Sequence, residues 1–436
     1  MKPVNVGLVG LGTVGCGTVS VLRRNENEIC RRAGRSIQVS HAAVRDPQKE
    51  RSCDLSDITL TTDPFEVVDN PEIEIIVELI GGESLSLEIV LRAIRNGKHV
   101  VTANKALIAI HGNEIFSAAQ EQGVTVAFEA AVGGGISIIK ALREGLAGNC
   151  IEWLAGIING TGNFILSEMR DAKRDFSDVL AEAQARGYAE ADPSFDVDGI
   201  DAAHKLTILA SIAFGIPLQY NQVYVEGISA LEQDDVEYAT ELGYRIKHLG
   251  IAKRVDEGIE LRVHPTLIPE RRLIANVDGV MNAILVKGDA VGPTLYYGAG
   301  AGAEPTASAV VADIVDVTRT LTSDPHNRVP HLAFQPGSLG SPEILPVERS
   351  ETAYYLRMNA VNRPGVLAEV TRIFGDLKIS IESILQKDRG DHESVVPIII
   401  LTQHTKEFRL DQALVELEKL DNVNGKIVRI RVETLK

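Results

Sequence analysis

A glycine-rich turn directly follows the first predicted strand, and no other feature of the sequence limits the possible fold as strongly. Residues 4–9 form an apolar β-type run, and Gly10, Gly12 and Gly15 then give the spacing G-x-G-x-x-G at the start of a helical pattern. Gly10 permits a tight turn, Gly12 lets a pyrophosphate approach the backbone, and Gly15 allows close helix–strand packing. The helix start supplies free N–H groups for phosphates. The motif predicts a βαβ unit that binds a nicotinamide dinucleotide through Gly10, Leu11, Gly12, Thr13, Val14 and Gly15.

The first third of the chain alternates short apolar runs with helical patterns, which is typical of βαβ units in a parallel doubly wound sheet. The run at residues 73–80 is almost wholly apolar, as expected for a parallel strand that is covered on both faces. This context favours a binding role for the glycine turn over a purely structural one. Further strands are expected at 37–44, 99–102 and 124–128, and helices at 13–32, 85–96 and 115–122.

Beyond Glu129 the pattern changes. Residues 131–302 mix strand-like and helical segments, which predicts an α+β domain, and the helical pattern at 303–321 is expected to return to the first domain. Residues 322–350 hold five prolines, a composition typical of a linker. Residues 351–436 follow the order strand, helix, strand, loop, strand, helix, strand, which is the ferredoxin-like pattern. The predicted fold class is α/β, with a Rossmann doubly wound sheet followed by an α+β domain and a ferredoxin-like domain.

Composition places the chain among ordinary globular proteins. Its 436 residues suggest about three domains, and 44% of them are hydrophobic. The net charge of −16 argues against non-specific nucleic-acid binding, which needs basic surfaces. No apolar run reaches the roughly 18–20 residues that cross a bilayer, and no signal pattern begins the chain. Because the four cysteines lack metal-ligand spacing, they indicate a reducing compartment, and we expect a cytoplasmic protein.

The end of the second predicted strand bears on which dinucleotide is bound. A unit that binds NAD usually carries an acidic residue there for the ribose diol. Here Arg45 stands at about that position, with Lys49 and Arg51 close behind, and a guanidinium can pair with a 2′-phosphate. Arg45 therefore favours NADP. NAD stays open because Asp46 could serve with a small shift of register, and Arg45 could be a solvated loop cation.

Two lysines stand where chemistry is expected. Lys105 follows the strand at 99–102, and ligands of doubly wound sheets bind at the carboxyl ends of the strands, so Lys105 is expected near the nicotinamide. Asp201 and Lys205 are four residues apart on one face of a helix that becomes strongly apolar. Partial burial makes a lysine usable for proton transfer, with Asp201 orienting it. The alternatives are an ordinary surface lysine at 105 and a surface salt bridge at 201–205.

Two further segments carry candidate ligand groups. Glu190 and Asp196 precede the Lys205 helix and could hold an ammonium group, whereas the EF-hand spacing of a calcium loop is absent. Glu129 begins a glycine run in which one carboxylate and turning backbone carbonyls could hold a hard monovalent cation. Spacing alone favours a tight strand-to-helix turn at this second segment.

The set of motifs resembles the homoserine dehydrogenase family, in its single-function bacterial form. The matching segments occur in family order, and the stretch at 362–367 resembles an ACT module, an amino-acid-sensing domain. The segments that carry the resemblance to the dehydrogenase are residues 10–15, 78–82, 101–105, 128–135, 158–163, 187–205 and 298–302.

This resemblance implies the interconversion of L-homoserine and L-aspartate 4-semialdehyde with NAD(P), in threonine, methionine and isoleucine biosynthesis. It implies that Lys205 is the proton donor and acceptor at the substrate oxygen and that Asp201 is its partner. Lys105 would lie between cofactor and substrate, and Glu190 and Asp196 would bind the substrate.

The resemblance also assigns roles to the domains. Residues 1–130, with the return segment 303–321, would bind NAD(P), and 131–302 would bind the substrate, catalyse the reaction and form the dimer. Residues 322–350 would be the linker and 351–436 an ACT regulatory domain, with threonine as the effector of a homodimer or homotetramer. The remaining implied sites are a cofactor contact at Gly302 and a sodium site at Glu129, Val132, Gly134 and Ile136.

Two other proteins would share some of these features. A sensor that joins an ACT module to a nucleotide-binding unit without turnover is one, but it would not need the set Lys105, Glu190, Asp201 and Lys205. A reductase that acts on acyl phosphates is the other, and it needs a nucleophilic cysteine. Cys150 lies in no such context. The sequence therefore favours a dehydrogenase.

Overall fold

The computed structural model describes residues 2–386 and 395–436, and the chain divides into two compact units. Unit 1 consists of residues 1–160, 201–223 and 280–342, and unit 2 of residues 161–200, 224–279 and 343–436. The predicted middle domain, 131–302, is thus shared between the two units, and the three-part division of the chain stays a prediction. The loop expected between Gln386 and Val395 lies outside the described residues.

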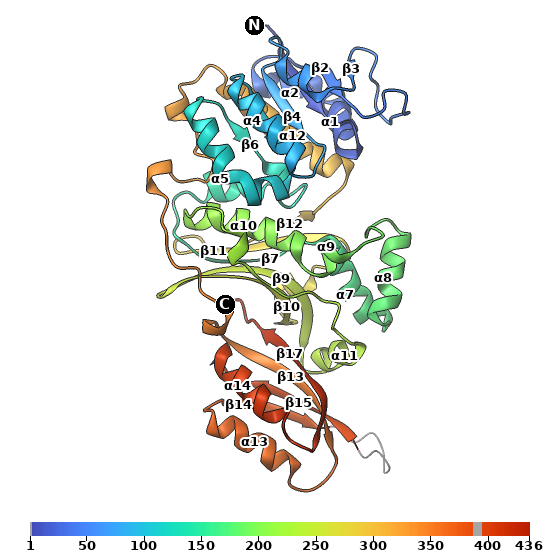
Figure 1. The fold of residues 1–436 in the computed structure, drawn as a ribbon, viewed down its shortest axis with the longest axis vertical. Helices are drawn as coiled ribbons and strands as arrows, with labels where there is room; N and C mark the ends of the chain where they lie inside the picture. Colours follow the sequence, from blue (N-terminus) through green and yellow to red (C-terminus); the bar gives the residue numbers. More distant parts are fainter. Residues whose placement is uncertain (1, 387–394) are drawn as a thin grey trace. The chain divides into compact units, whose positions relative to one another are not determined.

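Unit 1 begins with a six-stranded parallel sheet in the order β3-β2-β1-β4-β5-β6. This is the Rossmann strand order, so the predicted doubly wound sheet is confirmed, and its switch point lies between β1 and β4. Figure 1 labels β2, β3, β4 and β6 of this sheet. The strand bounds are β1 Val4–Val9, β2 Ile37–Ala43, β3 Thr59–Thr61, β4 Ile75–Glu78, β5 His99–Thr102 and β6 Val126–Ala127.

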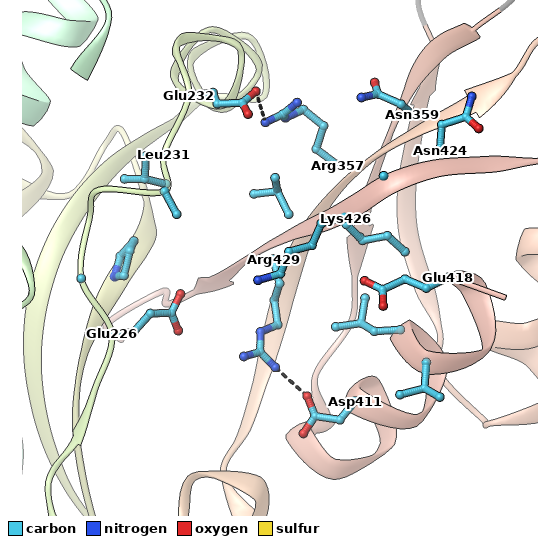
Figure 2. Close-up of a pocket in the computed structure, with 18 of the residues that line it drawn as sticks. Glu226, Leu231, Glu232, Arg357, Asn359, Asp411, Glu418, Asn424, Lys426 and Arg429 are labelled. Carbon is cyan, nitrogen blue, oxygen red and sulfur yellow. Dashed lines mark hydrogen bonds and ion pairs between the residues drawn. The ribbon is translucent and has the colours of Figure 1, made fainter. Parts of the chain in front are cut away.

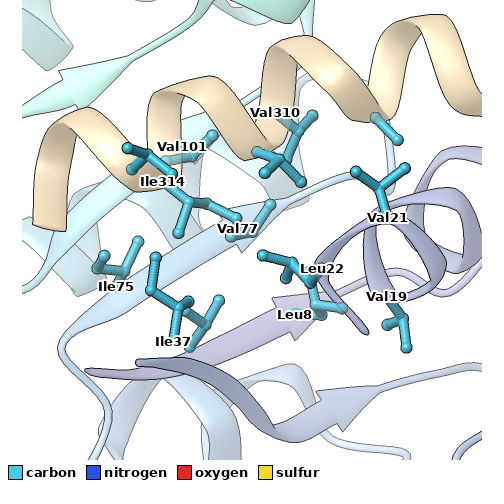
Figure 3. Packing of buried hydrophobic residues seen from close by; sticks show 14 of the residues in the cluster. Leu8, Val19, Val21, Leu22, Ile37, Ile75, Val77, Val101, Val310 and Ile314 are labelled. Atoms are coloured by element: carbon cyan, nitrogen blue, oxygen red, sulfur yellow. The ribbon is translucent and has the colours of Figure 1, made fainter. Parts of the chain in front are cut away.

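Helices cover both faces of this sheet. On one face α12 (Ala303–Thr320) lies beside α1 (Thr13–Arg24), and Figure 3 shows Val310 and Ile314 of α12 packed over Val77 of β4. On the other face Ile76 and Val100 are fully buried, because side chains alternate along a strand. The predicted helix at 13–32 is two helices that meet at Asn25. The remaining helices are α2 Glu26–Ala33, α3 Pro64–Asp69, α4 Ser84–Arg95 and α5 Lys105–Glu121.

The rest of unit 1 contains a three-stranded antiparallel group and the long buried helix α10 (Ile200–Phe214). Strand β11 pairs with β7 on one side and with β12 on the other. All of α10 from residue 201 to residue 214 is buried, which explains why it lacks a polar face. The other bounds are η1 Glu129–Ala131, α6 Ile138–Lys140, the π-turn η2 Ala141–Gly145, β7 Ile151–Ile157, β11 Met281–Gly288, β12 Gly292–Ala299, η3 Tyr220–Gln222, η5 Pro325–Asn327 and η6 Pro336–Ser338.

Unit 2 holds the predicted ferredoxin-like pattern, with the strand order β14-β15-β13-β17. Strand β10 extends this sheet by pairing in parallel with β17, so that Thr266 lies opposite Arg431. The bounds of the C-terminal elements are η7 Val347–Arg349, β13 Glu351–Val361, α13 Val366–Asp376, β14 Ile381–Gln386, β15 Val395–Thr402, β16 Thr405–Lys406, α14 Glu407–Leu417 and β17 Val423–Val432.

Both faces of the ferredoxin-like sheet are buried within unit 2. One face, with Tyr354 and Ile400, packs on α13 and α14. The other, with Tyr355 and Ile430, packs on helices from the middle of the chain and shares one hydrophobic cluster with them. The remaining elements of unit 2 are α7 Gly160–Ala172, α8 Phe176–Ala185, α9 Ser194–Val197, β8 Tyr224–Val225, α11 Gln233–Glu241, β9 Tyr244–Val255, β10 Gly258–Pro269 and η4 Leu273–Asn276.

Within residues 2–386 and 395–436, every helix is too short or too polar to cross a bilayer.

Candidate active site

The glycine turn has the geometry that a dinucleotide requires. Gly10 adopts φ +106°, and a Cβ there would lie 2.9 Å from the backbone of Leu79. A Cβ on Gly15 would collide with the Gly10 carbonyl oxygen, so the helix can start this close only without a side chain. At Gly12, in contrast, a Cβ would meet nothing within 4 Å. The turn is therefore tight inside and open at Gly12, where a pyrophosphate would approach.

Helix α1 presents its N-terminus at this turn. Its first turn contains no acidic side chain, and its N-cap, Gly12, offers no side-chain cap. The helix dipole and the N–H groups at this end thus favour an anionic ligand. Arg51 ties the loop after β2 to the turn, because its Nε donates to the Leu11 carbonyl at 3.3 Å. The sequence interpretation noted Arg51 only as a neighbouring cation.

Arg45 and Asp46 follow β2 and are both exposed. The Asp46 carboxylate accepts a hydrogen bond from the Gln48 amide at 2.9 Å, so it closes a local turn. Gly302, the other implied cofactor contact, has φ +125° and is the N-cap of α12. Helices α1 and α12 pack closely there, because a Cβ on Gly17 would lie 2.7 Å from the Ala303 carbonyl oxygen.

The three predicted catalytic residues form one cluster. The Asp201 carboxylate accepts from Lys205 Nζ at 2.7 Å through Oδ2, and Lys105 Nζ lies 2.8 Å from its Oδ1. The carboxylate is thus shared between lysines from two helices that lie about a hundred positions apart in the chain. The side chain of Asp201 is 4% exposed, that of Lys205 11% and that of Lys105 33%.

The cluster holds its carboxylate ionised. Burial alone would raise the pKa of Asp201, but the charges of Lys205 and Lys105 outweigh burial and keep that pKa well below its usual range. With two ammonium groups and one carboxylate, the protonated cluster carries a net positive charge. Such a site stabilises negative charge that develops on a substrate oxygen.

Neighbouring groups fix the orientation of Lys205 and Asp201. Lys205 Nζ also donates to the Ile158 carbonyl at 2.8 Å, and Asn159 Nδ2 donates to Asp201 Oδ2 at 2.8 Å. Asp201 stands in the first turn of α10, where the helix dipole favours an anion. Asn159 was missed as a site residue, although it lies in one of the segments that carry the family resemblance. The side-chain amide of an asparagine does not by itself indicate a site residue in a sequence. The role of Asn159 becomes visible only from its contact with Asp201.

Glu190 and Asp196 belong to unit 2, in the segment between α8 and α10. Glu190 is exposed and Asp196 is partly buried on the short helix α9. Ala189 and Val197 flank them and are both buried in the cluster that includes Tyr355. The two carboxylates are therefore held by anchors in the core of unit 2.

The predicted cation loop is built around a buried carboxylate. Both oxygens of Glu129 accept backbone hydrogen bonds, from Ile139 at 2.9 Å and from Lys140 at 2.8 Å. Burial and the nearby Asp313 charge raise the pKa of Glu129 to about 7. The side chain thus organises the start of α6, and each of its oxygens keeps further acceptor capacity. Within the described residues, no three His, Cys, Asp or Glu side chains gather as metal ligands.

A cavity of about 770 Å³ lies elsewhere, within unit 2 (Figure 2). Arg357 pairs with Glu232 at 2.7 Å and Arg429 with Asp411 at 2.7 Å along its wall. Glu226 and Glu418 add two further carboxylates to the lining. The lining therefore has more anionic than cationic groups, which is unfavourable for a dinucleotide.

The fold and the lysine cluster define a class of protein: a nicotinamide-dependent oxidoreductase that acts on a hydroxyl group and carries an amino-acid-sensing domain. Comparison with protein families agrees with each part. Residues 10–129 match the family described as homoserine dehydrogenase, NAD binding domain, residues 138–315 match homoserine dehydrogenase, and residues 354–422 match the ACT domain.

Individual relatives match along the whole chain. Homoserine dehydrogenase of Pseudomonas aeruginosa is 65% identical over 100% of both chains. The crystal structure of a homoserine dehydrogenase from Thiobacillus denitrificans has a TM-score of 0.96 at 66% identity, over 100% of this chain and 99% of that one. A hyperthermophilic archaeal homoserine dehydrogenase solved in complex with NADPH has a TM-score of 0.60 at 25% identity, over 73% and 98%. The chain belongs to the homoserine dehydrogenase family. It is an NAD(P)-dependent dehydrogenase that interconverts L-homoserine and L-aspartate 4-semialdehyde.

A pair of alanine substitutions separates the two roles of the glycine turn. Gly12→Ala places its Cβ in open space, so the melting temperature should be unchanged while NADPH binding weakens by about tenfold or more, equivalent to about 1.4 kcal/mol. Gly15→Ala creates an internal collision and should cost about 1–3 kcal/mol of stability. Thermal unfolding and fluorescence titration with NADPH measure both. Wild-type affinity in Gly12→Ala would show that the pyrophosphate does not approach this turn.

Proposed function

We propose that Lys205 is the group that exchanges a proton with the substrate oxygen. In the oxidation direction its neutral amine accepts the hydroxyl proton of homoserine as a hydride leaves the carbon that bears this hydroxyl. In the reduction direction its ammonium returns the proton to the oxygen. A bound nicotinamide supplies the acceptor or donor of that hydride. The supporting observation is the placement of Lys205 Nζ, which is nearly buried between Asp201 and the Ile158 carbonyl.

Lys105 and Asp201 support this proton transfer in different ways. Asp201 holds both amines and supplies the counter-charge that lets two lysines share one buried site. Lys105 begins α5 at the carboxyl edge of the sheet, where ligands of this fold bind, and its partial exposure leaves it accessible to a proton relay. We propose that Glu190 and Asp196 bind the amino group of homoserine, because each is a carboxylate on an anchored segment.

We propose NADP as the preferred cofactor, with NAD as the second possibility. Arg45 is exposed beyond β2, where a 2′-phosphate would lie, and the Asp46 carboxylate is used in a local turn. The archaeal relative was solved with NADPH. We further propose that Gly302 lies near the bound cofactor, since it begins α12 beside α1.

A sodium ion is proposed at the loop after β6. Gly133 and Gly134 turn the backbone with φ +73° and +52°, and carbonyl oxygens in such a turn suit a hard monovalent cation. The proposed ligands are Glu129 and the backbone carbonyls of Val132, Gly134 and Ile136. In this proposal the Glu129 side chain orders the loop.

The proposed assembly and location rest on surface and cysteine chemistry. We propose a homodimer or homotetramer, because β12 is an outer strand of its sheet and carries Tyr297, which is 58% exposed. A cytoplasmic location is proposed because all four cysteines are unbridged. The proposed domains remain 1–130 with 303–321, 131–302, the linker 322–350 and the ACT domain 351–436.

Feedback inhibition by threonine is proposed to act through homoserine binding. The ACT sheet residues Tyr355 and Ile430 share a buried cluster with Ala189 and Val197, which flank Glu190 and Asp196. A shift of the sheet on effector binding would therefore move the segment that carries these two carboxylates. A sensor without turnover is not favoured, since the chain carries the complete lysine cluster.

The role of Lys205 is tested by Lys205→Met, which keeps the length of the side chain and removes its amine. Turnover of homoserine should fall by about 10²–10⁴-fold, the usual value of general acid–base catalysis, while NADPH still binds. Lys287→Met, at a half-exposed lysine on β11, serves as the control and should be unchanged. Steady-state assays and NADPH titration measure these effects. Turnover near the wild-type rate in Lys205→Met would contradict the assigned role.

The threonine proposal is best tested in the full-length chain, because the ACT sheet is part of the core of unit 2 and its removal would expose apolar surface. We expect threonine to raise the KM for homoserine in the wild type and to leave the KM for NADP, measured in the same oxidation assay, almost unchanged. Asn362→Ala, in the exposed loop before α13, should abolish that effect without changing kcat, and Asn327→Ala is the matched control. Inhibition that persists in Asn362→Ala would exclude this loop as the effector site.

A further inference from the structure

Glu78 is a fully buried carboxylate at the switch point of the parallel sheet. It is the last residue of β4, beside the strand that leads into the glycine turn. Ligands of doubly wound sheets bind at this edge. Because a buried carboxylate is costly unless its oxygens are satisfied, its hydrogen bonds show what it organises.

Glu78 holds the loop that follows its own strand. Its Oε1 accepts from the amides of Ile80 at 2.9 Å and Gly81 at 3.1 Å, and from Ser86 Oγ at 3.1 Å. Gly81 and Gly82 have φ of +70° and +76°, and a Cβ at either would meet nothing within 4 Å. The loop is therefore bent around the carboxylate, with open space beside its two glycines.

The other oxygen holds the neighbouring strand. Glu78 Oε2 accepts from Thr102 Oγ1 at 2.7 Å, at the end of β5. Thr102 Oγ1 in turn accepts from the Asn104 amide at 3.0 Å, and Asn104 Nδ2 donates to the Gly82 carbonyl at 2.6 Å. These hydrogen bonds close a ring that runs from β4 through β5 and back to the Gly81–Gly82 loop, called the glycine loop below.

This ring of hydrogen bonds ends beside Lys105, which is proposed to take part in proton transfer. Asn104 is the N-cap of α5, where its Oδ1 accepts from the Leu107 amide at 3.1 Å, and Lys105 is the first residue of that helix. The same four side chains, Glu78, Ser86, Thr102 and Asn104, thus set the glycine loop at the ligand edge and the start of the helix that carries Lys105.

We propose that Glu78 is a positioning residue that holds the Gly81–Gly82 loop and Lys105 in one fixed relation. This relation aligns the bound cofactor with the cluster of Lys105, Asp201 and Lys205. The proposal rests in part on the proposed role of Lys105. A purely structural role would affect folding stability alone, whereas positioning affects the hydride-transfer step.

Glu78→Gln keeps the shape and replaces one acceptor by a donor facing the Thr102 hydroxyl. We expect kcat to fall by about 10–100-fold, the cost of a misplacement near 1 Å, and the KM for NADPH to rise. The primary isotope effect with NADPH deuterated at the transferred position should increase, because hydride transfer becomes rate-limiting. Glu74→Gln, at the residue just before the start of the same strand, is the matched control and should behave as wild type.

Thr102 provides an independent variant if Glu78→Gln does not fold. Thr102→Val removes the hydroxyl that links the two strands and should reproduce the lower kcat and larger isotope effect, while Thr102→Ser should restore both. A lower melting temperature with unchanged kcat and isotope effect, in Glu78→Gln and Thr102→Val alike, would overturn the proposal.

Lys105→Met separates this proposal from the role of Lys105. If Lys105→Met turns over normally while Glu78→Gln does not, the role of Lys105 is wrong and Glu78 still positions the glycine loop. If Lys105→Met is impaired while Glu78→Gln and Thr102→Val are normal, Lys105 keeps its role and the positioning proposal is wrong.

Discussion

The candidate active site depends on one buried carboxylate. Asp201 accepts bonds from Lys205, Lys105 and Asn159, and each partner comes from a different element of unit 1. Removing one partner from a buried ion pair typically costs about 3–5 kcal/mol, so this arrangement constrains where α5 and α10 can lie. The carboxylate also supplies the counter-charge that lets two ammonium groups share one buried site. Asp201 therefore matters both for the placement of α5 and α10 and for the proposed proton transfer.

The glycine turn and the Asp201–Lys205 pair could be predicted from local patterns in the sequence. The G-x-G-x-x-G turn specified the first βαβ unit because each glycine answers a local steric need, and the i, i+4 spacing predicted the Asp201–Lys205 pair because it lies on one helix. Lys105 was placed only generally, at the carboxyl edge of the sheet. Its bond to Asp201 joins residues that are distant in the sequence, as do the contacts of Asn159 and the ring around Glu78. The spacing of residues along the sequence does not indicate such long-range contacts. The break at Asn25 was missed because the apolar residues keep a helical spacing across it. Leu22, Ile29 and Ala33 all belong to the same buried cluster.

The structure also adds physical detail to two predicted parts. The segment proposed as the ACT regulatory domain has a sheet whose second face is buried against helices from the middle of the chain. That shared core gives a direct physical connection between the ACT sheet and the segment of Glu190 and Asp196. At the predicted cation loop, the Glu129 carboxylate is bonded to two backbone amides, so the loop is organised from within.

The most direct test of the account is the pH dependence of kcat/KM for homoserine oxidation in wild type and in Asp201→Asn. The carboxylate is ionised throughout the assay range, since its pKa is held far below its usual value, and its charge favours the ammonium form of Lys205. Oxidation requires the neutral amine, so loss of the charge should move the acid limb of the profile to lower pH, while the plateau rate falls because Lys205 is less well oriented. An acid limb at the same pH in both enzymes would contradict Lys205 as the proton acceptor paired with Asp201.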